Sequence, residues 1–195
     1  MLRFLIRHLA SAGKPERPVD GRGRRIVAVI ECLLNQNARD AGAANSAAMT
    51  WDLVSLCREH DVGLLQMPCP EVTCLGLDRA RQPGQSIHAL MLTQANRQAC
   101  ATIGVGVADR IETYVRSGYR VLAVLGGNPQ SPGCAVHQDG GALLPPSGVL
   151  MIELQAELRR RGLEIPFRGM RDGNADLLAE DLHWLRTVFS DLARS

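Results

Sequence analysis

The feature that most constrains the fold is an apolar run at residues 26–30, Ile-Val-Ala-Val-Ile, which contains no polar side chain. A strand buried on both faces of a parallel sheet has this pattern, whereas a strand with one solvated face alternates apolar and polar residues. Further runs rich in apolar residues, at 62–66, 119–125 and 163–167, predict three more strands. Strands that are buried on both sides need helices to cover both faces of their sheet.

Segments with the helical spacing of apolar residues follow each of these strands. The clearest cover 49–57, 107–115, 150–158 and 178–192. This alternation predicts a three-layer α/β fold of the Rossmann or flavodoxin type. We expect a mostly parallel, four-stranded sheet in the order 2-1-3-4, with helices on both faces and right-handed crossovers.

Single residues predict where some helices begin or break. Gly104 and Gly106 mark a break inside a helical stretch that begins near Ala89. Ser147 and Asn174 are the predicted N-caps of the last two helices, because their short polar side chains accept hydrogen bonds from a first helical turn.

We expect residues 1–25 to be a lead-in and residues 26–195 to form a single α/β domain. In the lead-in, Arg3, Arg7 and His8 interrupt a short apolar stretch, and a segment rich in Pro, Gly and Arg follows. The stretch is too short and too charged for a membrane span or a secretory signal. It is therefore predicted to be flexible or a short amphipathic helix.

The composition argues for a small molecule as partner. Hydrophobic residues make up 46% of the chain and charged residues 22%, with a formal net charge of +2. This charge gives no electrostatic reason to expect nucleic acid or a membrane as a partner. Six cysteines without a recognisable secretory leader indicate a reducing, cytoplasmic location, where clustered thiols bind metal or do chemistry more often than they form disulfides.

Three of the six cysteines come directly after predicted strands. Cys32 follows the first strand, Cys69 the second and Cys134 the third. Pro68 and Pro70 fix the backbone on either side of Cys69 and so restrain the direction of its thiol. Because the carboxyl ends of parallel strands form one edge of a sheet, the predicted strand order would bring the three thiols together.

Three thiolates at one site favour a soft metal: zinc, copper(I) or an iron–sulfur cluster. None of the local ferredoxin spacings occurs, so spacing alone does not decide among these. A tetrahedral zinc site would take its fourth ligand from Cys74 or His137. A cubane cluster held by three cysteines would instead keep one iron without a protein ligand, and that iron would act as a Lewis acid toward sulfur.

Three motifs, each after a predicted strand, resemble those of the thiouracil desulfidase family. They read Cys-Leu-Leu at 32–34, Pro-Cys-Pro-Glu at 68–71 and Ser-Pro-Gly-Cys at 131–134. The resemblance spans residues 26–140, and it rests on the three motifs occurring together in this order.

The resemblance implies an α/β protein in which Cys32, Cys69 and Cys134 hold a 4Fe-4S cluster. In this family the fourth iron is free to take sulfur from a thiolated pyrimidine. The third motif of the family usually reads Ser-Pro-Ser-Cys-Gly, whereas this chain has Gly133 and Ala135 around the cysteine. This departure indicates a divergent branch of the family.

Other candidate site residues lie in the same loops. Glu71, two residues after Cys69, could activate water or deliver a proton, or could be only a solvated charge or a cap. Ser131 could orient a substrate or water. Asn35, where many members of the family have glycine, and Arg39 could hold a substrate oxygen or nitrogen, with solvated loop residues as the alternative.

The function expected from the resemblance is that of a 4Fe-4S-dependent desulfidase. The open iron would accept the sulfur of a thiocarbonyl, water would attack the carbon, and sulfide would leave without net redox change. Two alternatives stay open: a zinc or iron–sulfur protein that senses or carries sulfur or metal, and a hydrolase with Cys134 as nucleophile and His137 as its partner. Cys57 and Cys100, in helical segments, are expected in the core.

Overall fold

The sheet has the predicted composition and strand order. The structure is a computed structural model that describes residues 20–191, so most of the predicted lead-in lies outside the described residues. Four strands, all parallel, lie in the order β2-β1-β3-β6. Their bounds are Arg25–Ile30 for β1, Gly63–Met67 for β2, Arg120–Gly126 for β3 and Phe167–Gly169 for β6.

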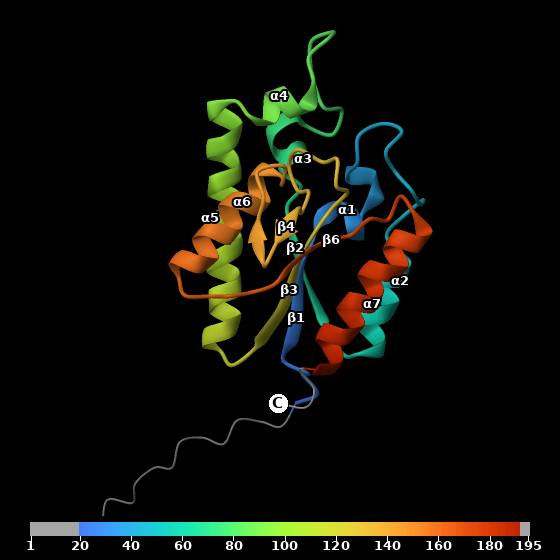
Figure 1. Cartoon of the computed structure of the whole chain (residues 1–195), viewed down its shortest axis with the longest axis vertical. Helices are drawn as coiled ribbons and strands as arrows, with labels where there is room; N and C mark the ends of the chain where they lie inside the picture. The colour runs from blue at the N-terminus through green and yellow to red at the C-terminus, as the bar shows by residue number, and fades with distance from the viewer. Residues whose placement is uncertain (1–19, 192–195) are drawn as a thin grey trace, which may run out of the picture.

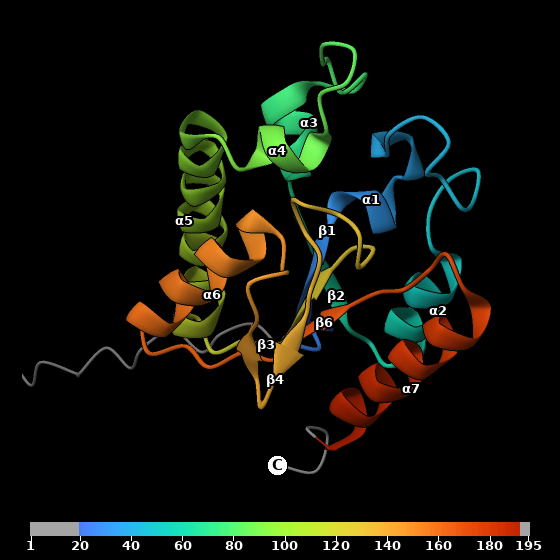
Figure 2. The same ribbon diagram turned by 45° about the horizontal axis from the view of Figure 1, so that its top comes forward.

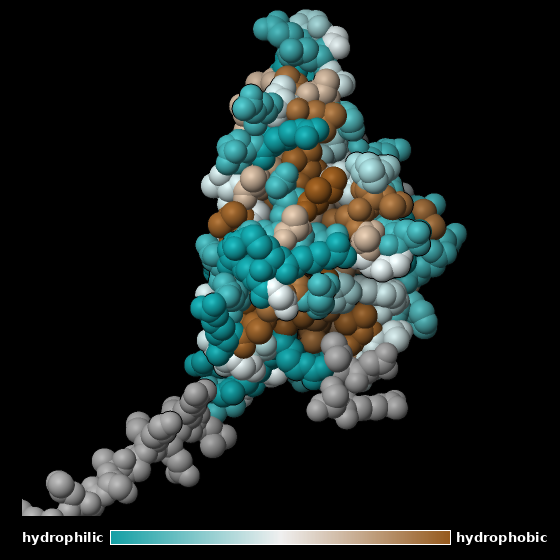
Figure 3. All heavy atoms as spheres, turned by 60° about the vertical axis from the view of Figure 1, so that its left-hand side comes forward, coloured by the Kyte–Doolittle hydropathy of each residue, from teal (hydrophilic) through white to brown (hydrophobic). Residues whose placement is uncertain are grey.

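Helices cover both faces of this sheet. Helices α5 (Gln94–Arg116) and α6 (Val149–Arg160) lie on one side, and α2 (Trp51–Glu59) and α7 (Ala175–Asp191) on the other (Figure 2). Figure 3 shows the α5 side of the molecule, where hydrophilic side chains cover most of the surface with hydrophobic ones between them. The three-layer α/β prediction is confirmed.

The carboxyl edge of the sheet carries the short elements (Figure 1). Helix α1 (Glu31–Leu34) follows β1 and is succeeded by a 3₁₀ helix, η1 (Gln36–Ala38). Helix α3 (Pro70–Leu75) follows β2, and α4 (Ile87–Met91) precedes α5. The loop after β3 contains a hairpin that the sequence did not predict, formed by β4 (Gln138–Asp139) and β5 (Ala142–Leu143).

The core lies between the sheet and its helices. Val27, Ala28, Val29 and Ile30 of β1 have no exposed surface, as expected for a central strand covered on both faces. Cys57 of α2 and Cys100 of α5 are also buried, as predicted. Among residues 20–191, no helix combines the length and the apolar character that crossing a membrane requires.

Three predicted boundaries are wrong for identifiable reasons. Helix α5 runs unbroken through both glycines, because Gly104 serves close packing: a β-carbon there would lie 3.3 Å from the backbone nitrogen of Leu154 in α6. The N-cap of α6 is Gly148, since the Ser147 hydroxyl bonds the backbone of His137 instead. The last strand begins later than predicted, because Pro166 has no N–H for the ladder.

The N-cap prediction at the start of α7 is confirmed. Asn174 accepts a hydrogen bond from the backbone N–H of Leu177 at 3.0 Å, and its side chain thereby satisfies one of the free donors of the first turn.

Candidate functional site

Three thiols meet at the carboxyl edge of the sheet. Cys32 lies in α1 directly after β1, Cys69 is the N-cap residue of α3 after β2, and Cys134 lies in the loop after β3. All three line one cavity of about 210 Å³. Each residue is at most 8% exposed. The topology therefore gathers residues that are 37 and 65 positions apart in the sequence (69 − 32 and 134 − 69).

Backbone contacts fix the thiols in place. The backbone N–H of Cys69 donates to Oε2 of Glu31 at 2.9 Å, which ties the loop after β2 to the loop after β1. Gly127 lies directly behind the other two cysteines. A β-carbon at Gly127 would be 2.9 Å from the Cys134 sulfur and 3.5 Å from the Cys32 sulfur, so only glycine leaves room for both.

Glu71 and Ser131 form a hydrogen-bonded pair on the wall of this cavity. The Ser131 hydroxyl donates to Oε1 of Glu71 at 2.6 Å and lies 3.2 Å from the Cys134 sulfur. It also accepts a hydrogen bond from the backbone N–H of Cys134 at 3.1 Å. The structure thus brings both predicted catalytic candidates to the cavity of the thiols.

Arg79 is a site residue that sequence reasoning missed. Its side chain is 1% exposed, and its Nε lies 3.4 Å from Oε2 of Glu71. Its Nη2 donates to the Ala38 carbonyl at 2.6 Å and lies 3.8 Å from the Cys69 sulfur. No signal in the sequence marks it, because its contacts with the Ala38 carbonyl and the Cys69 sulfur exist only in the fold.

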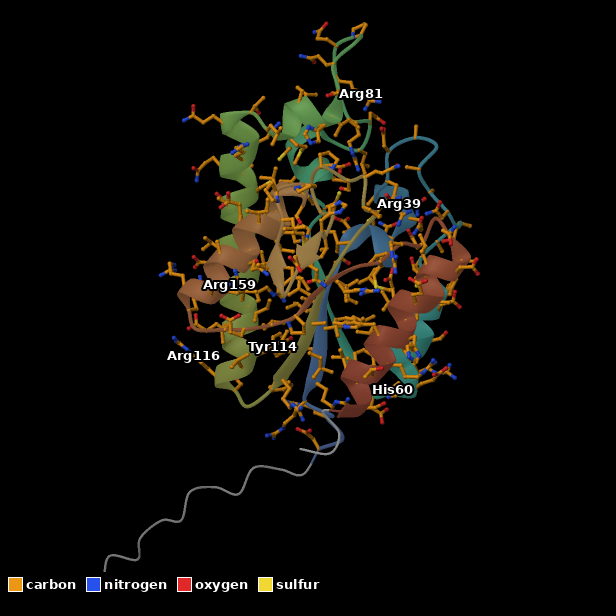
Figure 4. All side chains as sticks on the ribbon, in the orientation of Figure 1. Arg39, His60, Arg81, Tyr114, Arg116 and Arg159 are labelled. Atoms are coloured by element: carbon orange, nitrogen blue, oxygen red, sulfur yellow. The ribbon has the colours of Figure 1, made fainter. Side chains whose placement is uncertain are left out.

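Arg39 lines the cavity, whereas Asn35 does not. The Arg39 side chain lies beside α1 (Figure 4), is 6% exposed and forms an ion pair of 2.6 Å with Asp172. Asn35 is exposed, and its side-chain oxygen accepts from the backbone N–H of Asn37 at 3.2 Å, which caps η1. Of the two predicted substrate-binding residues, only Arg39 faces the cavity.

The three thiols differ in acidity. The hydrogen bond with the Cys134 thiol and the positive charge of Arg39 lower the pKa of Cys32, against the opposing effect of burial. Burial raises the pKa of the Cys69 thiol to about 11. The hydrogen bond to Cys32, together with burial, raises the pKa of Cys134 well above its ordinary value. Cys32 is therefore the first of the three to ionise.

His137 and Cys74 lie apart from the three thiols. The His137 ring donates from Nε2 to the Pro129 carbonyl at 2.8 Å, and the residue lines a second cavity beside Arg168. The Cys74 sulfur lies 3.8 Å from the Asn96 carbonyl oxygen and does not line the thiol cavity. Neither residue is placed to complete a tetrahedral site, and His137 is not placed to activate Cys134.

The donor set at the cavity consists of three thiols, and a single ion and a cluster place different demands on it. Within residues 20–191, no three His, Cys, Asp or Glu side chains converge on one point that could hold a metal ion, and this includes the three cysteines. A cubane cluster makes a different demand, since each thiolate binds a different iron and the thiols surround a volume. The cavity offers three soft donors, the ligand type that such clusters take, with guanidinium groups beside Cys32 and Cys69 to offset thiolate charge.

Comparison with known proteins gives a distant relative of unassigned activity. The chain is similar to the uncharacterized protein MJ0003 of Methanocaldococcus jannaschii, with 24% identity over 123 residues that make up 63% of this chain and 75% of that protein. No protein-family model matches the chain, and no solved structure is significantly similar to it. The function is therefore argued from the cavity and its residues.

Proposed function

We propose that this protein is a desulfidase that hydrolyses a thiolated heterocycle of the thiouracil class, with a 4Fe-4S cluster held by Cys32, Cys69 and Cys134. The observation that carries the proposal is that these thiols line the same cavity as the Glu71–Ser131 pair. The motif resemblance stated above supports the same assignment. All six cysteines are free, which suits a reducing cytoplasm.

The proposed reaction needs water and no electrons. When bound, the cluster would supply an iron without a protein ligand, a Lewis acid toward the sulfur of the substrate. A C–O bond forms from water to the carbon that carried sulfur, and the C–S bond breaks. A thiocarbonyl and water thus give a carbonyl and hydrogen sulfide, so neither carbon nor sulfur changes its oxidation state.

Glu71 is the group proposed to move the protons. Its Oε1 accepts from Ser131 at 2.6 Å and its Oε2 lies 3.4 Å from Arg79, so the carboxylate is held from both sides. In this position it takes a proton from the attacking water and returns it to the leaving sulfur. Ser131 keeps the carboxylate at the cavity wall, and its own hydroxyl lies 3.2 Å from the Cys134 sulfur.

The same cavity explains why the hydrolase alternative has less support. The contacts of the Cys134 thiol are with Ser131 and Cys32, neither of which is a histidine base, and its pKa is raised. A nucleophilic cysteine needs a lowered pKa or an adjacent base. A cluster-binding sensor without catalysis is separated from the desulfidase by the experiment below.

The test is anaerobic reconstitution followed by assay. Iron and acid-labile sulfide should be found in equal amounts, and the loaded protein should convert 2-thiouracil or a related thiolated ring to its oxygen analogue with release of sulfide, without added reductant. A protein that stays colourless under these conditions contradicts the cluster. A loaded protein that releases no sulfide from a panel of thiolated rings supports the sensor instead.

A further inference from the structure

Arg39 is an almost fully buried cation on the cavity wall. Its side chain is 6% exposed and that of its partner Asp172 is 3% exposed, with 2.6 Å between Nη2 and Oδ2. Burying a guanidinium is costly unless it is paired, and this one is paired by a carboxylate 133 positions away in the chain. The pair joins the loop before α2 to the loop between β6 and α7.

The hydrogen bonds of Arg39 leave donors free at the cavity. A guanidinium has five N–H donors. Here one bonds the Asp172 carboxylate, another bonds the Ala43 carbonyl at 3.1 Å, and the group also hydrogen-bonds the Cys32 thiol. The buried Nε has no hydrogen-bond partner of normal geometry within residues 20–191. Arg25 also has such an Nε but does not line this cavity. A buried donor without an acceptor is unfavourable, and the residue that carries this one lines the cavity.

Asp172 holds several side chains of the first loop at once. Besides Arg39, it accepts from Gln36 Nε2 at 3.0 Å, from Thr50 Oγ1 at 3.1 Å and from Asn45 Nδ2 at 3.2 Å. Both of its oxygens are therefore used, and four donors around one carboxylate leave it little freedom to turn. The position of Arg39 is set by a network rather than by one contact.

Apart from the thiols, the charged side chains that line the cavity are each paired. Arg39 is paired with Asp172, Arg79 lies 3.4 Å from Glu71, and Asp40 at the rim is paired with Arg81 at 3.3 Å. A phosphate dianion would add uncompensated negative charge to such a site. A neutral ring with a polar acceptor makes use of the free donors without this penalty.

We propose that Arg39 donates to a ring carbonyl oxygen of an uncharged heterocycle and that Asp172 is the residue that positions it. The class of ring rests on the proposed function, while the donor and its support rest on the contacts described here. Asp172 does not line the cavity, and of the four side chains that donate to it only Arg39 does.

The test is uracil binding to the anaerobically reconstituted protein, measured by calorimetry at equal iron content. Asp172→Asn and Arg39→Lys should each weaken binding by about 10- to 100-fold, the effect of losing a hydrogen bond from a charged donor. Arg39→Lys keeps the positive charge but loses the planar guanidinium with its several N–H donors. This variant still tests the proposal if Asp172→Asn does not fold. In an Arg39→Gln background, Asp172→Asn should cause no further loss. The matched control is Asp109→Asn, which removes a carboxylate paired with Arg161 between α5 and α6.

Four results would overturn the proposal: a wild-type protein that binds no uracil, unchanged affinity in Arg39→Lys, additive losses in the double variant, or competition by excess inorganic phosphate. The readout does not depend on turnover. Normal uracil binding without sulfide release contradicts the proposed function alone. Normal sulfide release, with uracil binding that does not respond to Arg39→Lys, contradicts this inference alone.

Discussion

The cavity divides the cysteines into two groups. Cys32, Cys69 and Cys134 line it, whereas Cys57 and Cys100 are buried in the core. Serine at any one of the first three should remove most of the iron bound after anaerobic reconstitution, because a cluster with three protein ligands has no spare thiolate. Cys57→Ala and Cys100→Ala should keep their iron. Loss of iron from either of these, in a folded protein, would mean that the ligands are assigned wrongly.

Glu71 should matter for turnover and not for iron. In Glu71→Gln the amide oxygen still accepts from Ser131, but the side chain no longer takes up a proton. We expect a loss of roughly 10²- to 10⁴-fold in the rate of sulfide release, the usual contribution of a positioned acid–base group. Iron content and rate are measured on the same sample, with Asp78→Asn, an exposed carboxylate just after α3, as the control. A near-normal rate would mean that Glu71 only holds Ser131 and Arg79 in place and does not transfer protons.

Site residues at strand ends can be predicted from the sequence, whereas residues that act through contacts with distant segments cannot. Cys69 could be predicted as a site residue because it stands between two prolines after a strand. Arg79 and Asp172 could not, because the contacts that place them there join distant parts of the chain, Arg79 with Ala38 and Asp172 with Arg39. Glu31 is a similar case, since its carboxylate accepts from the backbone of Cys69 across two strand ends. A local pattern carries no information about such partners.

At the scale of elements, the two glycines of α5 have different surroundings. A β-carbon at Gly104 would lie 3.3 Å from the backbone of α6, whereas one at Gly106 would meet nothing within 4 Å. Gly106→Ala should therefore stabilise the protein by about 0.5–1 kcal/mol through helix propensity. Gly104→Leu should destabilise it by about 1–3 kcal/mol, because α6 would be pushed away. Urea unfolding of both variants checks this, and equal effects of the two changes would contradict the packing role of Gly104.

The end of α6 should respond to acid. Arg160 and Arg161 lower the pKa of Glu157 from 4.5 to about 2. A carboxylate of this kind stabilises the fold above its pKa in the unfolded chain, and the contribution is lost as the pH falls through about 2. The difference in melting temperature between wild type and Glu157→Gln should thus be largest near neutral pH and decrease toward pH 2. Glu164→Gln, at a side chain that is 78% exposed, is the control. A difference that does not change with pH would rule out the ion pairs as its cause.

The whole molecule shows which parts of a fold follow from local pattern. The parallel sheet and its order could be predicted, because doubly buried strands and alternating helices leave few topologies. The hairpin of β4 and β5 could not, since strands of two residues carry no periodicity. The continuity of α5 was also missed, because glycine in a helix signals a break unless the neighbouring helix is known.

The position of the cavity also predicts how binding of a cluster changes the thermal stability of the whole protein. Its thiols come from the ends of β1, β2 and β3, so a bound cluster would cross-link three adjacent strands of the sheet. A group that binds only the folded state stabilises it, by about 2.7 kcal/mol when present at a hundredfold excess over its dissociation constant. For a chain of this size that corresponds to a rise of roughly 5–10 °C in melting temperature.

Anaerobic thermal unfolding of loaded and metal-free protein measures this rise. Cys57→Ala should show the same increase as wild type, and Cys69→Ser should show little or none, because only the second variant removes a thiol from the cavity. An equal rise in Cys69→Ser would place the metal elsewhere in the molecule. No rise in wild type, despite bound iron and sulfide, would mean that the cluster does not bridge the three strand ends.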